Sequence, residues 1–325
     1  MKYAAHFIPV LLFLCFWQSA YSQIRSIERA SVDSNGVEGN LDSDGAVIDG
    51  SGDLVAFRSD ASNFVVNDGN SSKDVFLRDI SQSTTTLISF GIDAGSGNND
   101  SGLATDETRP IHISDNGVYI AFASRADDLV SGDSNGAQDV FVYDSMQQSL
   151  SLRSVIFSSL STSADSEGAL VSDDGDVCVF SSLDTGFATN DQNGASDVIR
   201  RSEFALNSEV VSTEPSGDPG NAASSQAAMS SDGILVTFAS NATDLVAGDT
   251  NGRADVFFRD NTSRTIPIEL ISQSAGGQLG NGDSFQPHIS TDGRFIVFVS
   301  EATNLVSGDT NSFDDIYLRD RQLGT

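Results

Sequence analysis

The stretch LVSGDSNGAQDVFVYD, residues 129–144, is the strongest indication of the fold, because four close copies of it occur elsewhere in the chain. The first aspartate of this motif stands at positions 68, 133, 191, 249 and 309, so successive copies lie 58 to 65 residues apart. Self-similarity at a regular period is the signature of stacked supersecondary units. We therefore expect five units. The other copies are VVNDGNSSKDVFLRD (65–79), ATNDQNGASDVIRRS (188–202), LVAGDTNGRADVFFRD (245–260) and LVSGDTNSFDDIYLRD (305–320).

Each unit also contains the apolar alternation that is typical of a β-strand. A turn glycine is followed five residues later by phenylalanine, and two residues before that phenylalanine stands Val, Ile or Cys. A period of two residues predicts a strand. Intervening positions such as Ala121, Val179 and Val297 are apolar too, which is expected where both faces of a sheet are covered. The phenylalanines are Phe57, Phe122, Phe180, Phe238 and Phe298.

Every unit is therefore expected to supply four strands. Two are joined by the glycine turn, the third begins at the last aspartate of the motif, and the fourth is a segment such as IPIELIS (266–272). Four-stranded units packed through two apolar faces are the blades of a β-propeller. We expect an all-β, five-bladed β-propeller of four-stranded blades, closed by the N-terminal strand completing the last blade. The blades are predicted near residues 45–91, 110–156, 168–213, 226–272 and 286–320 plus 24–33.

The first residues resemble a secretory signal peptide. Lys2 gives a positive start, an apolar run ends near Trp17, and Ala20-Tyr21-Ser22 fits a cleavage site. We expect residues 1–22 to be this signal peptide and residues 23–325 to form a single domain, exported to the periplasm or the extracellular medium. Cys178 would then be the one remaining cysteine, which excludes an internal disulfide framework. Because Cys178 occupies a slot that is Val or Ile in the other units, we expect it to be buried.

The chain is strongly acidic. It has 17 Lys and Arg against 46 Asp and Glu, which gives a formal charge of −29. Such a surface repels nucleic-acid phosphates and anionic membranes, and it favours cations or basic partners. We therefore predict no nucleic-acid partner and no membrane insertion. Acidity of this kind can equally serve solubility in a salty medium, so charge alone does not identify a function.

Two phrases together carry a resemblance to a known family. They are S-x-DG-x-x-x-x-F-x-S and NLV-x-GD-x-NG-x-x-DVF-x-RD, which recur over residues 45–320. This pattern resembles the TolB-type (WD-like) β-propeller repeat family of exported bacterial proteins. The resemblance implies a propeller fold. It implies little about activity, because one fold hosts many functions, and no role in the Tol system is carried over.

The repeated Asp-x-Asn-Gly-x-x-Asp motif is a candidate calcium loop. Calcium takes six to eight oxygen ligands from carboxylates, amides and backbone carbonyls. The motif supplies side-chain oxygens at its first, third and seventh positions, and three copies fit best. An EF-hand is excluded, because the residues after the seventh position are extended and carry Asp144 about 16 Å from Asp139. The candidate ligands are Asp133, Asn135, Asp139, Asp249, Asn251, Asp255, Asp309, Asn311 and Asp315.

A purely structural interpretation of the same loops stays open. Asp and Asn side chains commonly accept hydrogen bonds from nearby backbone amides in Asx-turns. The aspartate that begins strand three would then bond to the serine that ends strand two. Those serines are Ser59, Ser124, Ser182, Ser240 and Ser300.

Two histidines precede Ile-Ser in the expected innermost strands. His112 and His288 belong to the second and fifth units, so they would line the central channel. They could simply pack there with satisfied hydrogen bonds. Alternatively, two imidazoles facing each other could bind a metal or act as acid and base.

The sequence favours a non-catalytic binding scaffold, with calcium as a candidate stabilising ion. In a propeller blade, the loop from strand two to strand three lies on the same face as the connection between blades, and in this chain those loops are rich in aspartate. We expect a monomer that engages a protein or another macromolecule by this acidic loop face, with the strand-three arginines on the opposite face. The arginines are Arg78, Arg200, Arg201, Arg259 and Arg319.

The alternative is a propeller enzyme, a polysaccharide lyase or hydrolase, that uses the loop face and the channel.

Overall fold

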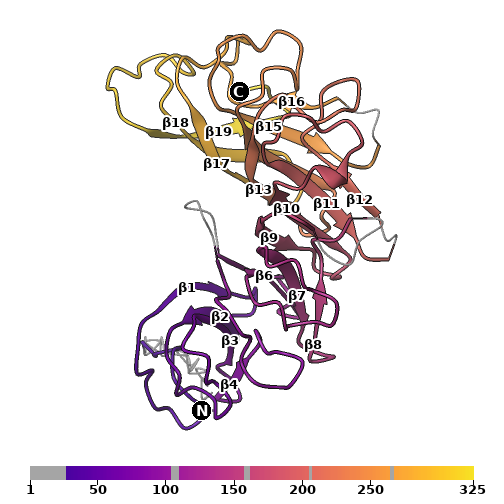
Figure 1. The fold of residues 1–325 in the computed structure, drawn as a ribbon. Helices are drawn as coiled ribbons and strands as arrows, with labels where there is room; N and C mark the ends of the chain where they lie inside the picture. The colour runs from indigo at the N-terminus through magenta and orange to yellow at the C-terminus, as the bar shows by residue number, and fades with distance from the viewer. Residues whose placement is uncertain (1–26, 104–109, 157–161, 205–206, 264–266) are drawn as a thin grey trace, which may run out of the picture.

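The computed structural model describes residues 27–103, 110–156, 162–204, 207–263 and 267–325, and the expected signal peptide lies outside these ranges. The described residues form five antiparallel sheets and one short 3-10 helix, η1 (Thr185–Phe187) (Figure 1). None of their helices has the length and apolar character needed to cross a bilayer.

Each sheet is a meander of strands that follow one another in the chain. Sheet 1 contains β1 (Ser43–Ile48), β2 (Leu54–Ser59), β3 (Asp74–Asp79) and β4 (Thr84–Leu87). Sheet 2 contains β5 (Ile111–Ile113), β6 (Tyr119–Ser124), β7 (Asp139–Asp144) and β8 (Ser149–Leu152). Sheet 3 contains β9 (Ser166–Val171), β10 (Val177–Ser182), β11 (Asp197–Ser202) and β12 (Asn207–Val210). Sheet 4 contains β13 (Ser224–Met229), β14 (Leu235–Ser240), β15 (Asp255–Asp260) and β16 (Glu269–Leu270). Sheet 5 contains β17 (Ser284–Ile289), β18 (Phe295–Ser300) and β19 (Asp315–Asp320).

The sheets stack side by side as propeller blades do, with their first strands innermost. Contacts link β1 to β5, β5 to β9, and β13 to both β9 and β17. Figure 1 shows the resulting arc, in which sheet 1 lies at the lower end and sheet 5 at the upper end. No comparable contact between β1 and β17 joins the two ends among the described residues. The prediction of an all-β fold with five repeated sheets is confirmed, and four of these sheets have the four strands expected.

The predicted closing strand is the exception. Sheet 5 has three strands, and residues 27–33, the described part of the 24–33 segment, add no strand to β19. Val32 instead forms a bridge with Glu38, and Arg78 of β3 donates a hydrogen bond to the Asp33 carbonyl oxygen at 3.2 Å. These contacts hold the segment on sheet 1, at the end of the arc away from β19, so closure is not observed.

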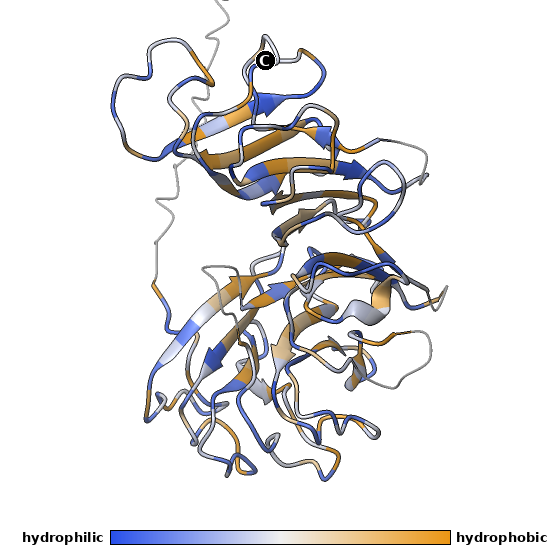
Figure 2. Cartoon of the chain, turned by 45° about the horizontal axis from the view of Figure 1, so that its top comes forward, coloured by the Kyte–Doolittle hydropathy of each residue, from blue (hydrophilic) through white to orange (hydrophobic). Residues whose placement is uncertain are grey.

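Strands with two apolar faces explain the stacking. In sheet 2, Phe122 and Phe141 face sheet 1 while Ala121 and Val140 face sheet 3, and all four are fully or almost fully buried. The strands carry the most hydrophobic residues of the cartoon, and the connections are largely hydrophilic (Figure 2). Cys178 is fully buried between sheets 2 and 3, as expected, and burial raises the pKa of its thiol to about 12.

The turn between the first two strands of each sheet depends on glycine, as predicted. Gly117 has φ +72°, a left-handed conformation that side chains disfavour. A Cβ placed on Gly117 would also come within 2.6 Å of Leu54 Cδ1 in the neighbouring sheet. The sharp turn thus serves the close approach of consecutive sheets. The equivalent glycines with positive φ are Gly52, Gly175, Gly233 and Gly293.

Nothing among the described residues covers the outer face of sheet 5, which corresponds to the face by which each earlier sheet packs on the next one. Ile316 and Leu318 of β19 are 80% and 59% exposed. Their counterparts in β15, Val256 and Phe258, are 0% and 3% exposed because sheet 5 packs on them. An apolar face of this kind normally lies against another element.

Replacing Phe122 by Ala tests the interlocking of the sheets. Phe122 is fully buried and stacks on Phe141 with ring centroids 6.1 Å apart, so Phe122→Ala should lower the free energy of unfolding by about 3–5 kcal/mol. Chemical denaturation followed by circular dichroism measures this. Phe204→Ala is the matched control, since Phe204 is 82% exposed; equal effects of the two variants would contradict the packing described.

Candidate functional site

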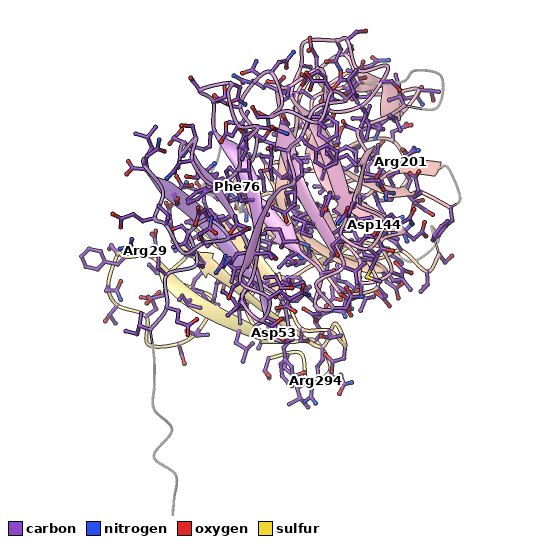
Figure 3. All side chains as sticks on the ribbon, turned by 90° about the horizontal axis from the view of Figure 1, so that it is seen from below. Arg29, Asp53, Phe76, Asp144, Arg201 and Arg294 are labelled. Carbon is purple, nitrogen blue, oxygen red and sulfur yellow. The ribbon has the colours of Figure 1, made fainter. Side chains whose placement is uncertain are left out.

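The repeated motif lies in the connection between the second and third strand of each sheet. Its last aspartate is the first residue of strand three in all five sheets. These residues, Asp74, Asp139, Asp197, Asp255 and Asp315, were expected at that place. The carboxylates are deeply buried in the first four sheets, where Asp139 and Asp255 have no exposed surface. Figure 3 shows that Phe76, two residues after Asp74, lies within the body of the molecule.

Neutral donors hold each of these buried carboxylates. In sheet 4, Ser272 Oγ donates to Asp255 Oδ1 at 2.5 Å and Asn251 Nδ2 donates to Asp255 Oδ2 at 2.7 Å. In sheet 2, Asn135 Nδ2 donates to Asp139 Oδ2 at 2.6 Å, and Ser154 Oγ and Thr162 Oγ1 donate to Asp139 Oδ1. The serine follows strand four of the same sheet, so this contact ties the start of strand three to the end of the adjacent strand four.

The serine partner expected from the sequence is therefore wrong. The serines that end strand two bond to a serine at the start of the first strand of the same sheet, or, in sheet 2, in the connection that leads to that strand, rather than to the aspartate. For example, Ser240 Oγ and Ser224 Oγ lie 2.8 Å apart, and Ser124 Oγ lies 2.8 Å from Ser101 Oγ. The reason is register, because Ser240 pairs with both Ser224 and Asp255 across the sheet but its hydroxyl faces the first strand.

The motif asparagine forms the Asx-turn that the structural interpretation expects. Asn251 Oδ1 accepts a hydrogen bond from the Arg253 amide at 3.0 Å, and Asn251 Nδ2 also donates to the Gly280 carbonyl at 3.1 Å. Asn135 makes the same contacts with the Ala137 amide and the Thr162 carbonyl. The asparagine thus joins the loop to the connection that leads into the next sheet, and its amide oxygen is already used.

The leading aspartate is the unusual member of the motif. Asp249 is 5% exposed, and neither of its carboxylate oxygens has a hydrogen-bond partner. The Asn251 amide lies near enough to favour the charged form, but outside hydrogen-bond geometry. Asp133 is 7% exposed and its Oδ1 is likewise without a partner. Buried carboxylate oxygens are normally bonded, so these two positions need an explanation.

Electrostatics make the paired aspartates resist ionisation. Burial raises the pKa of Asp74 and of Asp197 to about 7. Burial also raises the pKa of Asp255 to about 6, and the nearby charges of Asp249 and Asp283 act in the same direction. For Asp133, burial and then the Asp139 charge raise the pKa to about 6. The leading and last aspartates of these loops therefore lie buried close together, with no basic side chain of the described residues paired to them.

The described residues contain no group of three or more His, Cys, Asp or Glu side chains arranged to hold a metal. A cation in these loops would need backbone carbonyls and water beside the two carboxylates. Calcium accepts such mixed oxygen shells.

The two histidines line one cavity at the inner strands. His112 of β5 and His288 of β17 both contribute to a cavity of about 260 Å³, together with Gln226 and Gln286. The Val171 amide donates to His112 Nδ1 at 3.3 Å, so the proton of the neutral ring sits on Nε2. Gln226 and Gln286 have φ of 53° and 51°, a left-handed conformation unusual for glutamine. Sequence reasoning missed these glutamines.

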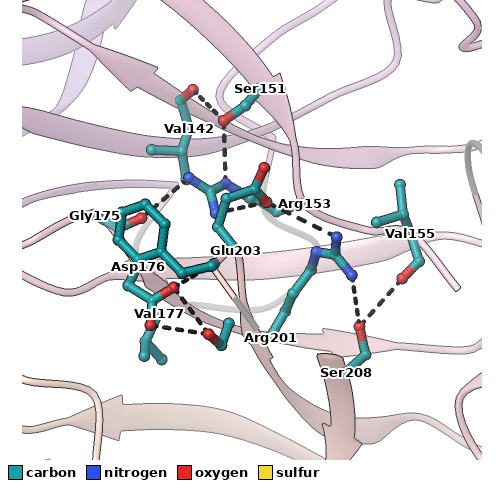
Figure 4. Close-up of polar contacts among 12 residues, drawn as sticks. Val142, Ser151, Arg153, Val155, Gly175, Asp176, Val177, Arg201, Glu203 and Ser208 are labelled. Atoms are coloured by element: carbon teal, nitrogen blue, oxygen red, sulfur yellow. Dashed lines mark hydrogen bonds and ion pairs between the residues drawn. The ribbon is translucent and has the colours of Figure 1, made fainter. Parts of the chain in front are cut away.

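Three of the strand-three arginines, which were expected on the face opposite the acidic loops, are buried. Arg78, Arg201 and Arg259 are 7%, 7% and 9% exposed, so they add little positive charge to that surface. Figure 4 shows Arg201 beside Arg153 and Glu203, where Arg153 Nη1 lies 3.0 Å from Glu203 Oε2 and Arg201 Nη1 donates to Ser208 Oγ at 3.1 Å. Burial lowers the pKa of the Arg201 guanidinium. The cluster fastens sheet 2 to sheet 3.

Comparisons with known proteins add little beyond these geometric findings. No protein-family model and no curated protein matches the chain. A solved TolB structure from Agrobacterium tumefaciens is 15% identical, covering 88% of this chain and 79% of that chain with a TM-score of 0.48. An oligogalacturonate lyase in complex with manganese is 13% identical, with coverage of 86% and 62% and a TM-score of 0.47. A prolyl endopeptidase structure is 12% identical, with coverage of 87% and 35% and a TM-score of 0.46. Likenesses of this strength carry no inference about activity.

The raised pKa of Asp197 gives a pH-dependent stability. Its folded-state pKa of about 7 exceeds the ordinary aspartate pKa of 3.8, so the proton is bound more tightly in the folded state. The resulting stabilisation is complete below pH 4 and is lost as the pH rises towards 7, by at most about 1.4 kcal/mol per pH unit. Asp197→Asn should reduce the overall slope of stability against pH, to which Asp74 also contributes, and should melt at a higher temperature than the unsubstituted protein at pH 8 in EDTA.

Thermal melts between pH 4 and pH 8 measure that slope. The exposed Asp53, which lies at the periphery in Figure 3, provides the control Asp53→Asn. An unchanged slope in Asp197→Asn would show that the Asp197 carboxyl does not titrate in this range.

Proposed function

We propose that the protein is an exported propeller scaffold that binds a basic protein or another basic macromolecule through its acidic loop face, without catalysis. The acidic loop face consists of the connections between strands two and three and the connections between sheets. Each fully described connection carries at least one Asp or Glu, and only Lys73, Arg125 and Arg253 are basic. The described loops are 32–42, 60–73, 88–100, 125–138, 183–196, 211–223, 241–254, 271–283 and 301–314.

The observation that carries this proposal is the preorganisation of those loops. At three junctions between sheets, an asparagine exchanges hydrogen bonds with the loop that follows strand two of the next sheet. Asn98 bonds to Asp127 and Asp128, Asn221 bonds to Thr243 and Asp244, and Asn281 does the same with Thr303 and Asn304. Loops fixed before binding lose less conformational entropy when a partner docks.

A pair of matched variants tests the acidic loop face. Glu301 and Asp314 are exposed on it and have no side-chain hydrogen bond in the structure, whereas Asp53 and Asp115 are exposed at the opposite edge. Glu301→Gln with Asp314→Asn should weaken partner retention several-fold at low salt, and Asp53→Asn with Asp115→Asn should not. Pull-down from periplasmic extract or culture medium, quantified at two salt concentrations, measures the difference. Equal retention by both variants would remove the acidic loop face from the proposal.

The export route belongs to the same proposal. Residues 1–22 would be cleaved, leaving a mature monomer in the periplasm or the medium. The aspartate loops would bind calcium as a structural ion. N-terminal sequencing of the secreted protein checks the cleavage site, and light scattering checks the monomer.

Ring closure is part of the proposed state. The loop at residues 32–41 repeats the loops that follow strand four elsewhere, since Arg78 bonds the Asp33 carbonyl as Arg319 bonds the Gln273 carbonyl. The residues just before it would be strand four of sheet 5, and the uncovered face of that sheet would pack on sheet 1. The apolar residues Ile316 and Leu318 support this arrangement because they would become buried by it.

A lysine substitution distinguishes the closed ring from the open arc. If the ring closes, Ile316→Lys buries a charge and should destabilise the protein by several kcal/mol, as Val256→Lys should in either case. If the arc stays open, Ile316→Lys should change stability by less than about 0.5 kcal/mol. Chemical denaturation of both variants decides between the two states.

The second candidate is a polysaccharide lyase or hydrolase. The cavity at His112 and His288 favours it, because left-handed Gln226 and Gln286 store backbone strain there. Activity on a panel of acidic and neutral polysaccharides, abolished in His112→Ala with His288→Ala, would replace the scaffold proposal. A lack of activity across the panel supports the scaffold.

A further inference from the structure

We infer that calcium binds the buried aspartate pairs of sheets 2 and 4, Asp133 with Asp139 and Asp249 with Asp255, and that sheet 5 uses a tyrosine hydroxyl in place of the ion. This deepens the calcium part of the proposed function and does not depend on the partner.

Sheet 5 shows what the leading aspartate needs. There Tyr317 is the third residue of strand three, β19, and its hydroxyl lies 2.9 Å from Asp309 Oδ2 and 3.0 Å from the Ala302 carbonyl oxygen. A carboxylate oxygen and a carbonyl oxygen thus converge on one polar group. The Asn311 amide adds a hydrogen bond to Asp309 Oδ1 at 3.3 Å. Asp309 therefore has partners on both oxygens.

Sheets 2 and 4 have the same frame without that hydroxyl. Phe141 and Phe257 stand at the position of Tyr317 and stack on Phe122 and Phe238, as Tyr317 stacks on Phe298. Phenylalanine offers no hydrogen-bond donor, so Asp249 keeps two oxygens without a partner and Asp133 keeps one. Both side chains are more than nine-tenths buried. A buried carboxylate oxygen without a partner is energetically costly.

The second carboxylate of each pair makes a cation the natural partner. Asp255 has no exposed surface, and the polar groups bonded to its side chain, from Ser272 and Asn251, are uncharged. A third carboxylate, Asp283, lies close by and accepts a hydrogen bond from the Ala254 amide at 3.1 Å. Arg253 lies 3.8 Å from Asp283 but remains half exposed. The buried pair itself therefore has no positive neighbour.

Calcium fits these loops better than the other common ions. All the available donors are oxygens, which excludes the nitrogen and sulfur preference of zinc. Magnesium demands an octahedral shell at short distance, whereas calcium accepts irregular shells that include backbone carbonyls. Two protein carboxylates with carbonyls and water give the modest affinity of extracellular modules, on the order of 0.1–1 mM. A chain that is exported would meet calcium at such concentrations.

The remaining sheets differ for identifiable reasons. Asp68 of sheet 1 and Asp191 of sheet 3 are only partly buried; Asp191 Oδ1 is buried without a partner, but the residue as a whole keeps exposed surface. In sheet 1 the loop lacks the Gly-Asp start, because Asn67 precedes Asp68, and in sheet 3 Asn190 precedes Asp191. The inference is accordingly restricted to two sites.

The experiment uses the mature chain without any partner, stripped with EDTA. Isothermal titration with CaCl₂ should give two sites, and 5 mM calcium should raise the melting temperature by about 5 °C. Phe141→Tyr with Phe257→Tyr should raise the melting temperature in EDTA and abolish the calcium-dependent rise. Tyr317→Phe, the reverse change in sheet 5, should lower the melting temperature in EDTA and add a calcium response.

Asp133→Asn with Asp249→Asn provides a second arm if a buried tyrosine hydroxyl disturbs folding. These isosteric changes should also remove calcium binding while the protein stays folded in EDTA. MgCl₂ at the same concentration should give a smaller rise than calcium. No heat of calcium binding, or a calcium response unchanged in the double tyrosine variant, would overturn the inference. If the unsubstituted protein retains no partner in the pull-down but binds calcium as expected, only the scaffold proposal is contradicted.

Discussion

The whole architecture depends on strands that are apolar on both faces. Phe122 and Ala121 are neighbours in β6, yet both are fully buried, one against sheet 1 and the other against sheet 3. Exposing either face of such a sheet to water is unfavourable, so both faces must be covered, by a neighbouring sheet or, on the outer side of sheet 1, by its own loop residues Ala61 and Phe64. The stacked arc satisfies this requirement at every internal sheet. The requirement is not met at Ile316 and Leu318 of sheet 5, whose side chains are exposed because no other sheet packs on them among the described residues.

Sequence reasoning found the repeated elements because the repeat is local. The period-two pattern around Phe238 and the last motif aspartate, Asp255, locate β14 and β15 within a residue or two. Closure could not be derived in the same way. Whether residues near 27 reach β19 depends on the curvature summed over five sheet interfaces, and no single segment encodes that sum. The local contacts that do exist, such as Arg78 with the Asp33 carbonyl, hold that segment on sheet 1.

The same division applies to the candidate site. Positions of the motif aspartates followed from the repeat, and Asx-turns at Asn135 and Asn251 followed from side-chain chemistry. The serine partner of the strand-three aspartate did not, because Ser272 is 17 residues from Asp255 and is brought to it by the fourth strand. The contrast between Tyr317 and Phe257 was visible in the sequence. It acquired meaning only when the hydroxyl was placed against Asp309.

The unpaired edge strand β19 affects how copies of the chain associate with one another. Its outward peptide groups and the apolar side chains of Ile316 and Leu318 form a template on which a strand of another molecule could add. The net charge of −29 opposes such joining by mutual repulsion. Dissolved salt weakens that repulsion over distances beyond about 10 Å. While that edge strand stays unpaired, self-association of the chain would therefore depend on ionic strength more steeply than the stability of the fold does.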